Sequence, residues 1–398
     1  MDQSKGNRVK ISNGNIVTPY RIIKNGCLLV ADGIITAVEE TNLAVEGYQE
    51  IDAKGNYISP GFIDIHTHGG GGHDFLDGTC EAYTKAAELH AQYGTTSLLP
   101  TATTATNDEL KKTLHAFQKA KADNPKGAEL LGLHMEGPYF SMEQRGAQDP
   151  KYIRNPDPKE YEEICENTDA IIRWSAAPEL PGALRFGRYL SDRGILPSIA
   201  HTDANYQEVE RAFENGFRHV THLYSGMSGV HRKNAYRYAG VIESAYLIDE
   251  MTVEIIADGC HLPASLLKLI YKIKGPDKIA LVTDSIRAAG MPEGETLLGS
   301  LGKGQLAIVE DGVAKLPDRT AFAGSVATTD RLVRNMINLA DVPLNEAVRM
   351  MTRTPAAIIG LDKRKGSLAA GKDADIIIFN DNIDIQMTMV GGRLVYNA

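Results

Sequence analysis

Two histidines one residue apart, His66 and His68, lie at the end of the apolar run Ile58–Gly69. Alternate side chains of a β-strand share a face, so both imidazoles can point toward one ion. Imidazole is the commonest metal ligand in proteins, but a His-x-His pair at a strand end is also found as a hydrogen-bonded surface feature. The pair alone therefore leaves both interpretations open.

Further ionisable residues follow other apolar runs of the chain. In chain order they are Glu136, Glu179, His201, His222, Asp258 with His261, and Asp284. A single histidine or carboxylate at such a place is commonly a satisfied hydrogen-bonding group or a helix cap. Five candidate ligands and a spare carboxylate after successive runs together indicate a metal site. By contrast His90, His115 and His219 fall inside helix-like or strand segments, so we predict that they are structural, and Cys260 is predicted to be a small packed side chain.

The elements that must position these residues alternate along the middle of the chain. Eight apolar runs predict strands at Phe62–Ile65, Thr95–Leu99, Leu130–Met135, Ile171–Ala176, Ile195–Ala200, His219–Leu223, Thr252–Ala257 and Lys278–Thr283. Helical patterns are found at Glu81–Tyr93, Asp108–Lys121, Asn205–Asn215, Pro263–Ile273, Thr328–Ala340 and Leu344–Ile359. This order fits a (β/α)₈ TIM-like barrel or a doubly wound open sheet. The ionisable residues favour the barrel, because its strand ends converge on one mouth.

Both chain ends have a different character. Residues 8–58 contain short β-rich segments separated by the turn dipeptides Asn13-Gly14, Asn25-Gly26 and Asp32-Gly33, which predict antiparallel strands. The last part, with Gly391-Gly392 as a turn, repeats this style. Each end is too short to bury a core alone, so we expect both to share one small β-sandwich domain. The predicted division is 1–58 with 366–398 for the sandwich and 59–365 for the barrel.

Composition excludes several classes of protein. The chain has 398 residues and a formal net charge of −9, and its pI is about 5.7. It has no basic cluster, which argues against nucleic acid as a partner. The four cysteines contain no Cys-x-x-Cys pair and predict neither a disulfide framework nor a thiolate zinc site. No run resembles a signal peptide or approaches membrane-spanning length, so we expect a cytoplasmic protein without membrane contact.

A series of motifs in this order resembles the N-acetylglucosamine-6-phosphate deacetylases of the amidohydrolase superfamily. The motifs are His66-Thr-His68 after Pro60-Gly-Phe-Ile-Asp64, His134-Met-Glu-Gly-Pro138, Ala177-Pro-Glu179, His201-Thr-Asp-Ala204, Thr221-His-Leu-Tyr224, Asp258-Gly-Cys-His261, Val282-Thr-Asp284 and Ala323-Gly-Ser325. The segment Gly371-Lys-Asp-Ala-Asp375 is similar to the place where that superfamily's chain returns to its β-sandwich. The resemblance covers nearly the whole chain. It implies a metal-dependent hydrolase of amino sugar metabolism that releases acetate from N-acetylglucosamine 6-phosphate.

Residue by residue, the resemblance implies that Glu136, His201 and His222 bind the principal divalent metal. His66 and His68 then hold a second ion, with Glu136 bridging the two. Imidazole and carboxylate ligands suit zinc or iron, and the sequence does not choose between these metals.

Amide hydrolysis also needs a carboxylate that accepts a proton from water and later gives one to the departing amine. Asp284 is the expected residue, because it follows the last strand and lies outside the ligand set. His261 matches the family position that contacts the sugar.

Two stretches depart from the family pattern. Many relatives have a histidine that helps to polarise the substrate carbonyl where this chain has Gln148, whose uncharged amide can still donate a hydrogen bond. The segment Ser225–Gly240 also differs. We expect the phosphate to be held by the backbone amides of Ser225 and Gly226 and by Arg237, with His231 as a further donor. The resemblance implies a homodimer in which the arginine comes from the neighbouring subunit.

Alternatives to this function remain open at this point. The chain could deacetylate N-acetylgalactosamine 6-phosphate or an unphosphorylated amino sugar. It could also be a non-catalytic relative that kept the sugar pocket as a binding module, although a binding protein does not require the full set of metal ligands together with Asp284.

Overall fold

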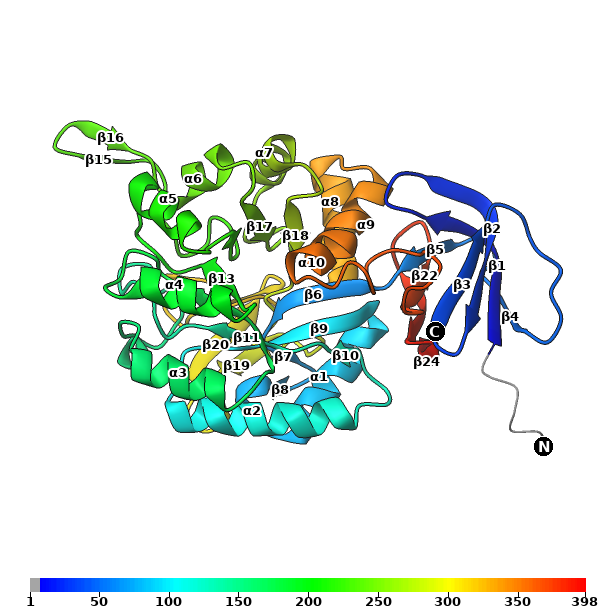
Figure 1. The fold of residues 1–398 in the computed structure, drawn as a ribbon, viewed down its shortest axis with the longest axis horizontal. Coiled ribbons are helices and arrows are strands. Elements are labelled where there is room, and N and C mark those ends of the chain that lie inside the picture. The colour runs from blue at the N-terminus through cyan, green and yellow to red at the C-terminus, as the bar shows by residue number, and fades with distance from the viewer. Residues whose placement is uncertain (1–7) are drawn as a thin grey trace.

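Parallel strands close into a barrel in the middle of the chain. The computed structural model describes residues 8–398, and Figure 1 shows the barrel with its surrounding helices beside a smaller sheet. The barrel strands are β6 (Phe62–Thr67), β9 (Thr95–Ala102), β11 (Leu133–Glu136), β12 (Ile171–Ala176), β13 (Leu196–Ile199), β14 (His219–Val220), β17 (Thr252–Ile255) and β18 (Ile279–Leu281). The ends meet where the Asp284 N–H donates to the His66 carbonyl (2.9 Å) and the His68 N–H donates to the Ser285 carbonyl (2.8 Å). The prediction of a (β/α)₈ barrel, which the placement of the ionisable residues favoured over an open sheet, is confirmed.

Helices cover the outside of the barrel. They are α1 (Cys80–Gln92), α2 (Asn107–Ala122), α3 (Pro158–Glu166), α4 (Ala183–Asp192), α5 (Tyr206–Glu214), α6 (Val241–Leu247), α7 (Ala264–Lys274), α8 (Thr329–Ala340), α9 (Leu344–Met351) and α10 (Arg353–Ile358). Their buried sides pack on the strands through large side chains such as Tyr83, Phe117 and Phe186. In the described chain, no helix has both the length and the apolar character needed to cross a membrane.

Two predicted elements are interrupted in the structure. The helix expected at Leu344–Ile359 is broken at Thr352 (φ −133°, ψ −82°), because Pro355 has no N–H to donate and its ring would clash with the preceding turn. The strand expected at Leu130–Met135 divides into β10 (Glu129–Leu130) and β11. Gly132 lies at this division, where a Cβ would approach Ile172 to 2.4 Å.

The two chain ends share one sheet. Its strands are β1 (Arg8–Val17), β2 (Ile22–Ala31), β3 (Ile34–Glu39), β4 (Gln49–Asp52), β5 (Tyr57–Pro60), β22 (Ile376–Phe379), β23 (Ile385–Val390) and β24 (Arg393–Asn397). The sheet curls so that the Ile35 N–H donates to the Lys372 carbonyl at 2.8 Å. It encloses a core that includes Ile11, Leu28 and Ile376.

The expectation of purely antiparallel pairing in the N-terminal strands was wrong. β4 and β5 pair with β1 in parallel, because the chain crosses over after β3 and returns along the free edge of β1. The domain boundaries, 1–58 with 366–398 and 59–365, stay a prediction. Residues 1–7, where we expected no signal peptide, lie outside the described part.

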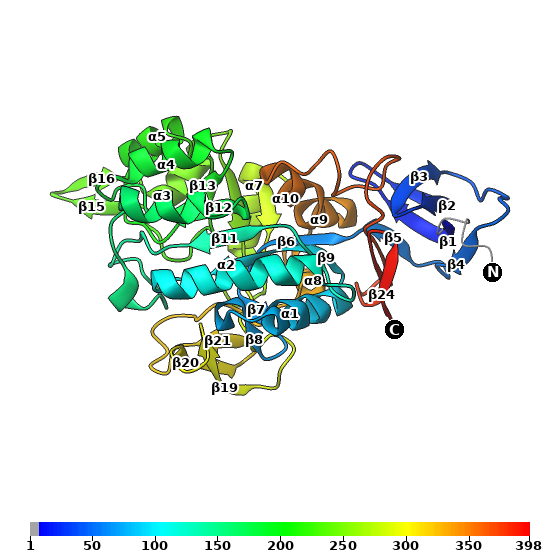
Figure 2. The same cartoon turned by 60° about the horizontal axis from the view of Figure 1, so that its bottom comes forward.

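Smaller elements extend from the barrel loops. They are β7 (Gly69–Gly70) with β8 (His73–Asp74), the hairpin β15 (His231–Lys233) with β16 (Tyr236–Tyr238), the meander β19 (Gly294–Leu298), β20 (Gln305–Glu310) and β21 (Val313–Lys315), and 3₁₀ turns at Phe75–Asp77 and Pro150–Tyr152. The hairpin projects away from the body in both ribbon views, and Figure 2 shows the meander on the side of α1.

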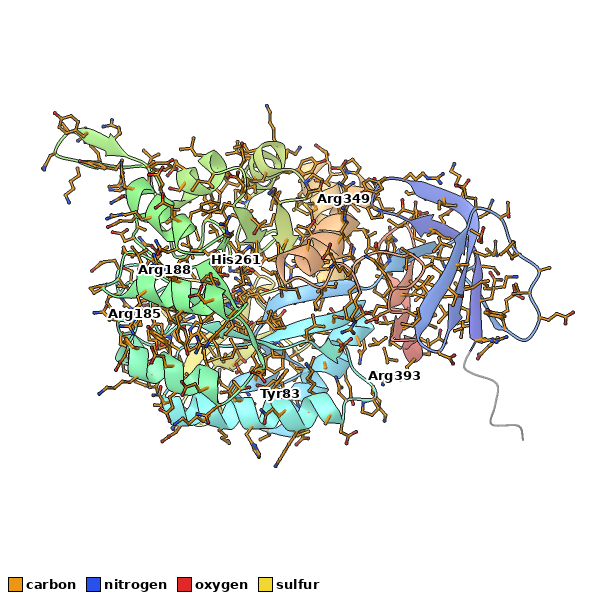
Figure 3. The ribbon with its side chains drawn as sticks, viewed as in Figure 1. Tyr83, Arg185, Arg188, His261, Arg349 and Arg393 are labelled. Atoms are coloured by element: carbon orange, nitrogen blue, oxygen red, sulfur yellow. The ribbon has the colours of Figure 1, made fainter. Side chains whose placement is uncertain are left out.

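Polar contacts join the small sheet to the barrel. Arg349 of α9 donates to the Pro19 carbonyl, and Arg393 of β24 donates to the Pro125 carbonyl. Figure 3 shows these two arginines at the junction. The side chain of Lys365 is also buried there (1% exposed), with Nζ 2.5 Å from Asp375 and 2.6 Å from Glu129. Burial lowers the pKa of Lys365, but these carboxylates raise it more, so the net pKa lies above its ordinary value.

Lys365→Met is expected to lower the free energy of unfolding by about 3–5 kcal/mol, because buried carboxylates lose their counter-charge. Urea denaturation measures this change. Lys363→Met is the matched control, since Lys363 is exposed two residues away and should change stability by about 0.5 kcal/mol or less. Equal stability of the two variants would contradict the role of Lys365 as the counter-charge of these carboxylates.

Candidate metal centre and active site

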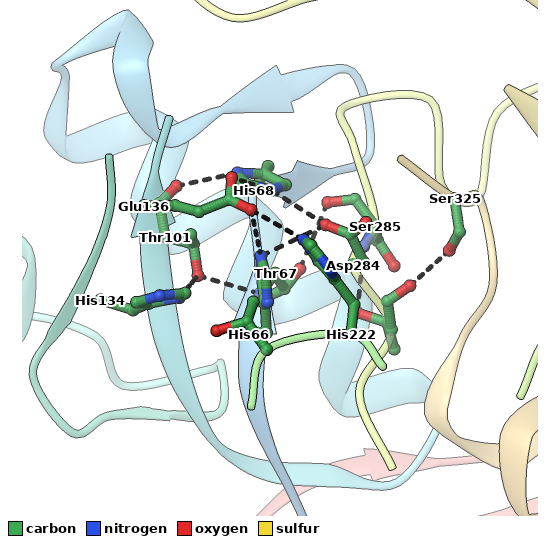
Figure 4. Close-up of polar contacts among 12 residues, drawn as sticks. His66, Thr67, His68, Thr101, His134, Glu136, His222, Asp284, Ser285 and Ser325 are labelled. Atoms are coloured by element: carbon green, nitrogen blue, oxygen red, sulfur yellow. Dashed lines mark hydrogen bonds and ion pairs between the residues drawn. The ribbon is translucent and has the colours of Figure 1, made fainter. Parts of the chain in front are cut away.

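The predicted ligands converge at the carboxyl ends of the barrel strands. His66 lies on β6 and His68 directly follows it, Glu136 ends β11, and His201 and His222 follow β13 and β14. All five are buried. Figure 4 shows His66, His68 and His222 grouped around the Glu136 carboxylate, with Asp284 beside them. These residues come from distant parts of the sequence, so the barrel closure brings them together.

Backbone strain accompanies this convergence. His201, His222 and Asp284 have φ values of 45°, 25° and 49°, in the left-handed region that side chains other than glycine rarely adopt. Such strain costs about 1–3 kcal/mol for each residue and persists where the surroundings enforce it, often at functional sites. The turns after β13, β14 and β18 therefore direct these three side chains into the mouth.

Glu136 is the common neighbour of the histidines. Its Oε1 lies 3.1 Å from His222 Nε2, 3.4 Å from His201 Nε2 and 3.6 Å from His66 Nε2. Its Oε2 lies 3.6 Å from His68 Nε2. The donor atoms form two groups, His66 with His68 and Glu136, and Glu136 with His201 and His222, and the atoms of each lie within 4.8 Å of one another. One carboxylate thus serves both groups.

Outer hydrogen bonds turn three of the rings toward the centre. The Nδ1 atoms of His66, His68 and His201 lie 2.6 Å from Glu254 Oε1, 3.2 Å from the Thr101 carbonyl and 2.8 Å from the Gln144 carbonyl. These oxygens only accept, so each Nδ1 carries a proton, and a neutral ring then turns the lone pair of Nε2 toward the centre. His66 Nε2 is buried without a hydrogen-bond partner, and a bound ion would satisfy this nitrogen, since buried polar atoms are rarely left unpaired. The arrangement fits a divalent metal held by imidazole and carboxylate.

The carboxylates of the cluster are held in the ionised form. Burial would raise the pKa of Glu136, but hydrogen bonds from His201 and His222 hold it well below its ordinary value. Burial also opposes ionisation of Asp284, yet the nearby His66 and the hydrogen bond from His68 lower its pKa. Asp284 Oδ1 lies 2.9 Å from His68 Nε2. Both groups can therefore act as bases or bind a cation.

A buried ion pair beneath the cluster was missed in the sequence. Glu254 of β17 accepts from His66 Nδ1, and its Oε2 lies 2.5 Å from Arg173 Nη1 of β12. Both residues are fully buried. Burial would raise the pKa of Glu254, but Arg173 and His66 hold it well below its ordinary value. The sequence did carry a signal for this pair, because Arg173 and Glu254 each lie inside an apolar run. A charged residue at such a position is rarely buried without a partner.

Other histidines and carboxylates remain outside the ligand groups. His219 bonds to Thr252 and Glu254, and His90 bonds to the Gly69 carbonyl, as expected of structural residues. His134 lies beside His66 with both ring nitrogens in hydrogen bonds, to Thr101 and Ser175. Glu179, which follows β12, accepts from Thr202 and from the Asp203 N–H.

A cavity of about 280 Å³ opens over the cluster. Its lining residues include the predicted substrate residues Gln148, Ser225, Gly226 and His261, together with Leu298, Ala321 and Phe322. His261 Nδ1 lies 2.8 Å from Asp258 Oδ2, and its ring packs against Phe322. Figure 3 shows His261 within the barrel part of the molecule. The wall from Leu298 and Phe322 was not predicted, because no pattern in residues 294–322 ties that segment to the barrel mouth.

Two predicted substrate residues do not reach this cavity. His231 and Arg237 are exposed on the β15–β16 hairpin, which projects from the body (Figure 1). They are outside the cavity lining of their own chain. Neither side chain contacts the cavity of its own chain in this arrangement.

Comparison with known proteins gives concordant matches. A model described as the amidohydrolase family matches residues 57–395. The chain is 34% identical to the N-acetylglucosamine-6-phosphate deacetylase of Bacillus subtilis (strain 168), over 96% of this chain and 95% of that protein. It is 32% identical to the N-acetylgalactosamine-6-phosphate deacetylase of Escherichia coli O157:H7, over 92% and 94%.

A solved structure agrees with these matches. The N-acetylglucosamine-6-phosphate deacetylase from Pasteurella multocida superposes with a TM-score of 0.91 at 30% identity, and the match covers 98% of this chain and 100% of that one.

Proposed function

This chain belongs to the amidohydrolase family, and we propose that it hydrolyses N-acetylglucosamine 6-phosphate to glucosamine 6-phosphate and acetate. The observation that carries the proposal is the pair of His/Glu groups, with Asp284 beside them, at the bottom of a small cavity. The relative from Bacillus subtilis and the solved structure from Pasteurella multocida are named for this substrate. A cavity of about 280 Å³ is at the small end of ligand sites and suits a monosaccharide.

The histidines and Glu136 divide between two ion positions in this proposal. Glu136, His201 and His222 would hold the principal divalent metal, and His66 and His68 together with Glu136 would hold a second, with zinc or iron as the ion. When bound, such an ion supplies Lewis acidity and lowers the pKa of water toward about 7. Glu254, the Thr101 carbonyl and the Gln144 carbonyl keep the ligand rings in place for binding.

Asp284 moves the proton in this reaction. Its ionised carboxylate accepts a proton from the attacking water at Oδ1 or Oδ2, and the resulting acid then protonates the nitrogen of the departing amine. This transfer is needed because an amine anion is a poor leaving group. The pKa of Asp284 lies below its ordinary value, so its carboxylate is ionised and able to accept the proton.

The sugar phosphate is held around the rim of the cavity. His261, fixed by Asp258, contacts the sugar, and the backbone amides of Ser225 and Gly226 face the phosphate. Arg237 completes the phosphate site from the projecting hairpin of a second subunit, so the functional unit is a homodimer. Val230 (61% exposed) and Tyr236 (72% exposed) are apolar side chains at this hairpin. Their exposure supports the proposal that a second subunit covers the hairpin.

Arg237→Ala is expected to raise KM for the phosphorylated sugar by about 10- to 100-fold, since a charge-assisted hydrogen bond contributes about 1.5–3 kcal/mol. The phosphate is remote from the amide and is bound about equally in the ground and transition states, so kcat stays nearly unchanged. Steady-state kinetics of acetate release measures both constants. Lys233→Ala, on the same hairpin, is the control.

Mixing Arg237→Ala subunits with Asp284→Asn subunits tests the origin of the arginine. A mixed dimer has one site with an intact Asp284 and an Arg237 donated by the other chain. Recovery of the low KM in the mixture supports the shared site. A mixture no better than its two parents contradicts it.

N-Acetylgalactosamine 6-phosphate is the second candidate substrate, favoured by the similarity to the Escherichia coli enzyme. Comparing kcat/KM for acetate release from the two epimers, and from unphosphorylated N-acetylglucosamine, tests the choice. We expect the phosphorylated gluco epimer to be preferred. Equal values with and without phosphate would instead show that the phosphate is not recognised.

A further inference from the structure

Gln148 lies between the metal cluster and a neighbouring strand end. It is 8% exposed, and its amide is engaged at both ends. Nε2 donates to Glu136 Oε2 at 2.7 Å, while Oε1 accepts from the Thr104 N–H at 3.1 Å and from the Thr104 hydroxyl at 2.8 Å. Gln148 thus connects the segment after β9 to the shared carboxylate.

The orientation of this amide is fixed by its partners. A backbone N–H can only donate, so the atom that faces the Thr104 N–H must be the amide oxygen. The amide nitrogen is then directed at Glu136, whose ionised carboxylate only accepts. Exchange of the two amide atoms would leave two donors facing each other at Thr104 and two acceptors facing each other at Glu136.

The hydrogen bond selects one oxygen of Glu136. Oε1 faces His201 and His222, at 3.4 and 3.1 Å, whereas Oε2 faces His68 at 3.6 Å. Only Oε2 receives the bond from Gln148. Because a bond to one oxygen restricts rotation of the carboxylate, Gln148 holds the plane in which each oxygen is presented to a different group of histidines.

The loop that carries Gln148 is itself anchored. Gln305 of β20 donates to the Ala147 carbonyl at 2.7 Å, and the Gln144 carbonyl accepts from His201 Nδ1 at 2.8 Å. Residues 144–148 therefore orient two proposed ligands of the principal metal, Glu136 through Gln148 and His201 through the backbone.

We propose that Gln148 is a positioning residue that fixes the rotation of the Glu136 carboxylate so that its two oxygens serve the two halves of the metal centre. The proposal rests on the metal centre assigned under the proposed function. It gives Gln148 a role that acts through Glu136, in place of the direct polarisation of the substrate carbonyl expected from the sequence. Removing the amide should therefore weaken metal binding even when no sugar is present.

The test measures metal binding by Gln148→Met and Gln148→Leu. Both variants keep a side chain of similar size but lack the amide N–H that donates to Glu136. Metal-depleted protein is titrated with Zn²⁺ against a competing chelator, and the bound metal is counted by mass spectrometry. We expect the Kd for Zn²⁺ to rise by about 10- to 100-fold, the usual effect of losing an outer hydrogen bond to a ligand. The melting temperature of each metal-depleted variant, compared with wild type, checks the fold.

Glu143→Met is the matched control, because Glu143 is exposed in the same loop and should leave the Kd unchanged. A folded Gln148 variant that binds Zn²⁺ as tightly as wild type overturns the proposal, and a raised KM with normal metal content would place Gln148 on the substrate. The two hypotheses fail separately. A wild-type protein that binds zinc but hydrolyses no N-acetyl sugar contradicts the proposed function and leaves the Gln148 measurement valid.

Discussion

Asp284→Asn is expected to lower kcat by about 10²- to 10⁴-fold, the range that general acid–base catalysis contributes. The substitution keeps the size of the side chain and its place near His68, where Oδ1 lies 2.9 Å from Nε2. The amide cannot accept and return a proton at neutral pH. KM and metal content should stay close to wild type, because Asp284 is assigned neither to sugar binding nor to the ligand set.

Steady-state kinetics and metal analysis on the same preparation measure this effect. Glu179→Gln is the matched control, since Glu179 also follows a barrel strand but bonds to Thr202 and Asp203 outside the cluster. It should turn over substrate at nearly the wild-type rate. A normal kcat in Asp284→Asn would assign proton transfer to another residue, and loss of metal in that variant would make Asp284 a ligand.

His201→Ala is expected to remove the principal metal and the activity together. His201 is one of three residues in its ligand group, and its ring is already fixed by the Gln144 carbonyl. Without this imidazole the group keeps only two ligands, Glu136 and His222. Catalytic zinc sites use three protein ligands. His66→Ala should also lower the metal content, with a smaller effect on activity if the second ion is accessory.

Mass spectrometry of bound metal, beside acetate release, follows both quantities. His115→Ala is the control, because His115 is exposed on α2, and it should retain both. A His201→Ala protein with full metal content and full activity would refute the ligand assignment. Loss of activity with full metal content would assign His201 to catalysis instead.

The barrel could be predicted because its signals are local. Each buried strand is a short apolar run, and most runs have an ionisable residue at or just after the strand end, as with Glu136 at the end of β11 and Asp284 after β18. The amphipathic helices α1, α2, α5, α7 and α8 were predicted within a residue or two of their observed ends, because caps and periodicity act over a single turn.

Features that depend on distant partners could not be predicted. The parallel pairing of β4 and β5 with β1 depends on a crossover that the local β pattern does not encode. Arg173 and Glu254 are opposite charges 81 positions apart, and only closure of the barrel brings them to 2.5 Å. Likewise the amide of Gln148 was expected to face substrate, but Thr104, 44 positions away, orients it toward Glu136.

The most direct test of the central claim is acetate release from N-acetylglucosamine 6-phosphate by protein stripped of metal and then reconstituted with Zn²⁺ or Fe²⁺. We predict that the stripped protein is inactive and that one of these ions restores turnover together with bound metal at the His/Glu cluster. Unaltered turnover after complete metal removal, or no acetate release from this sugar in any reconstituted form, would contradict a metal-dependent deacetylase.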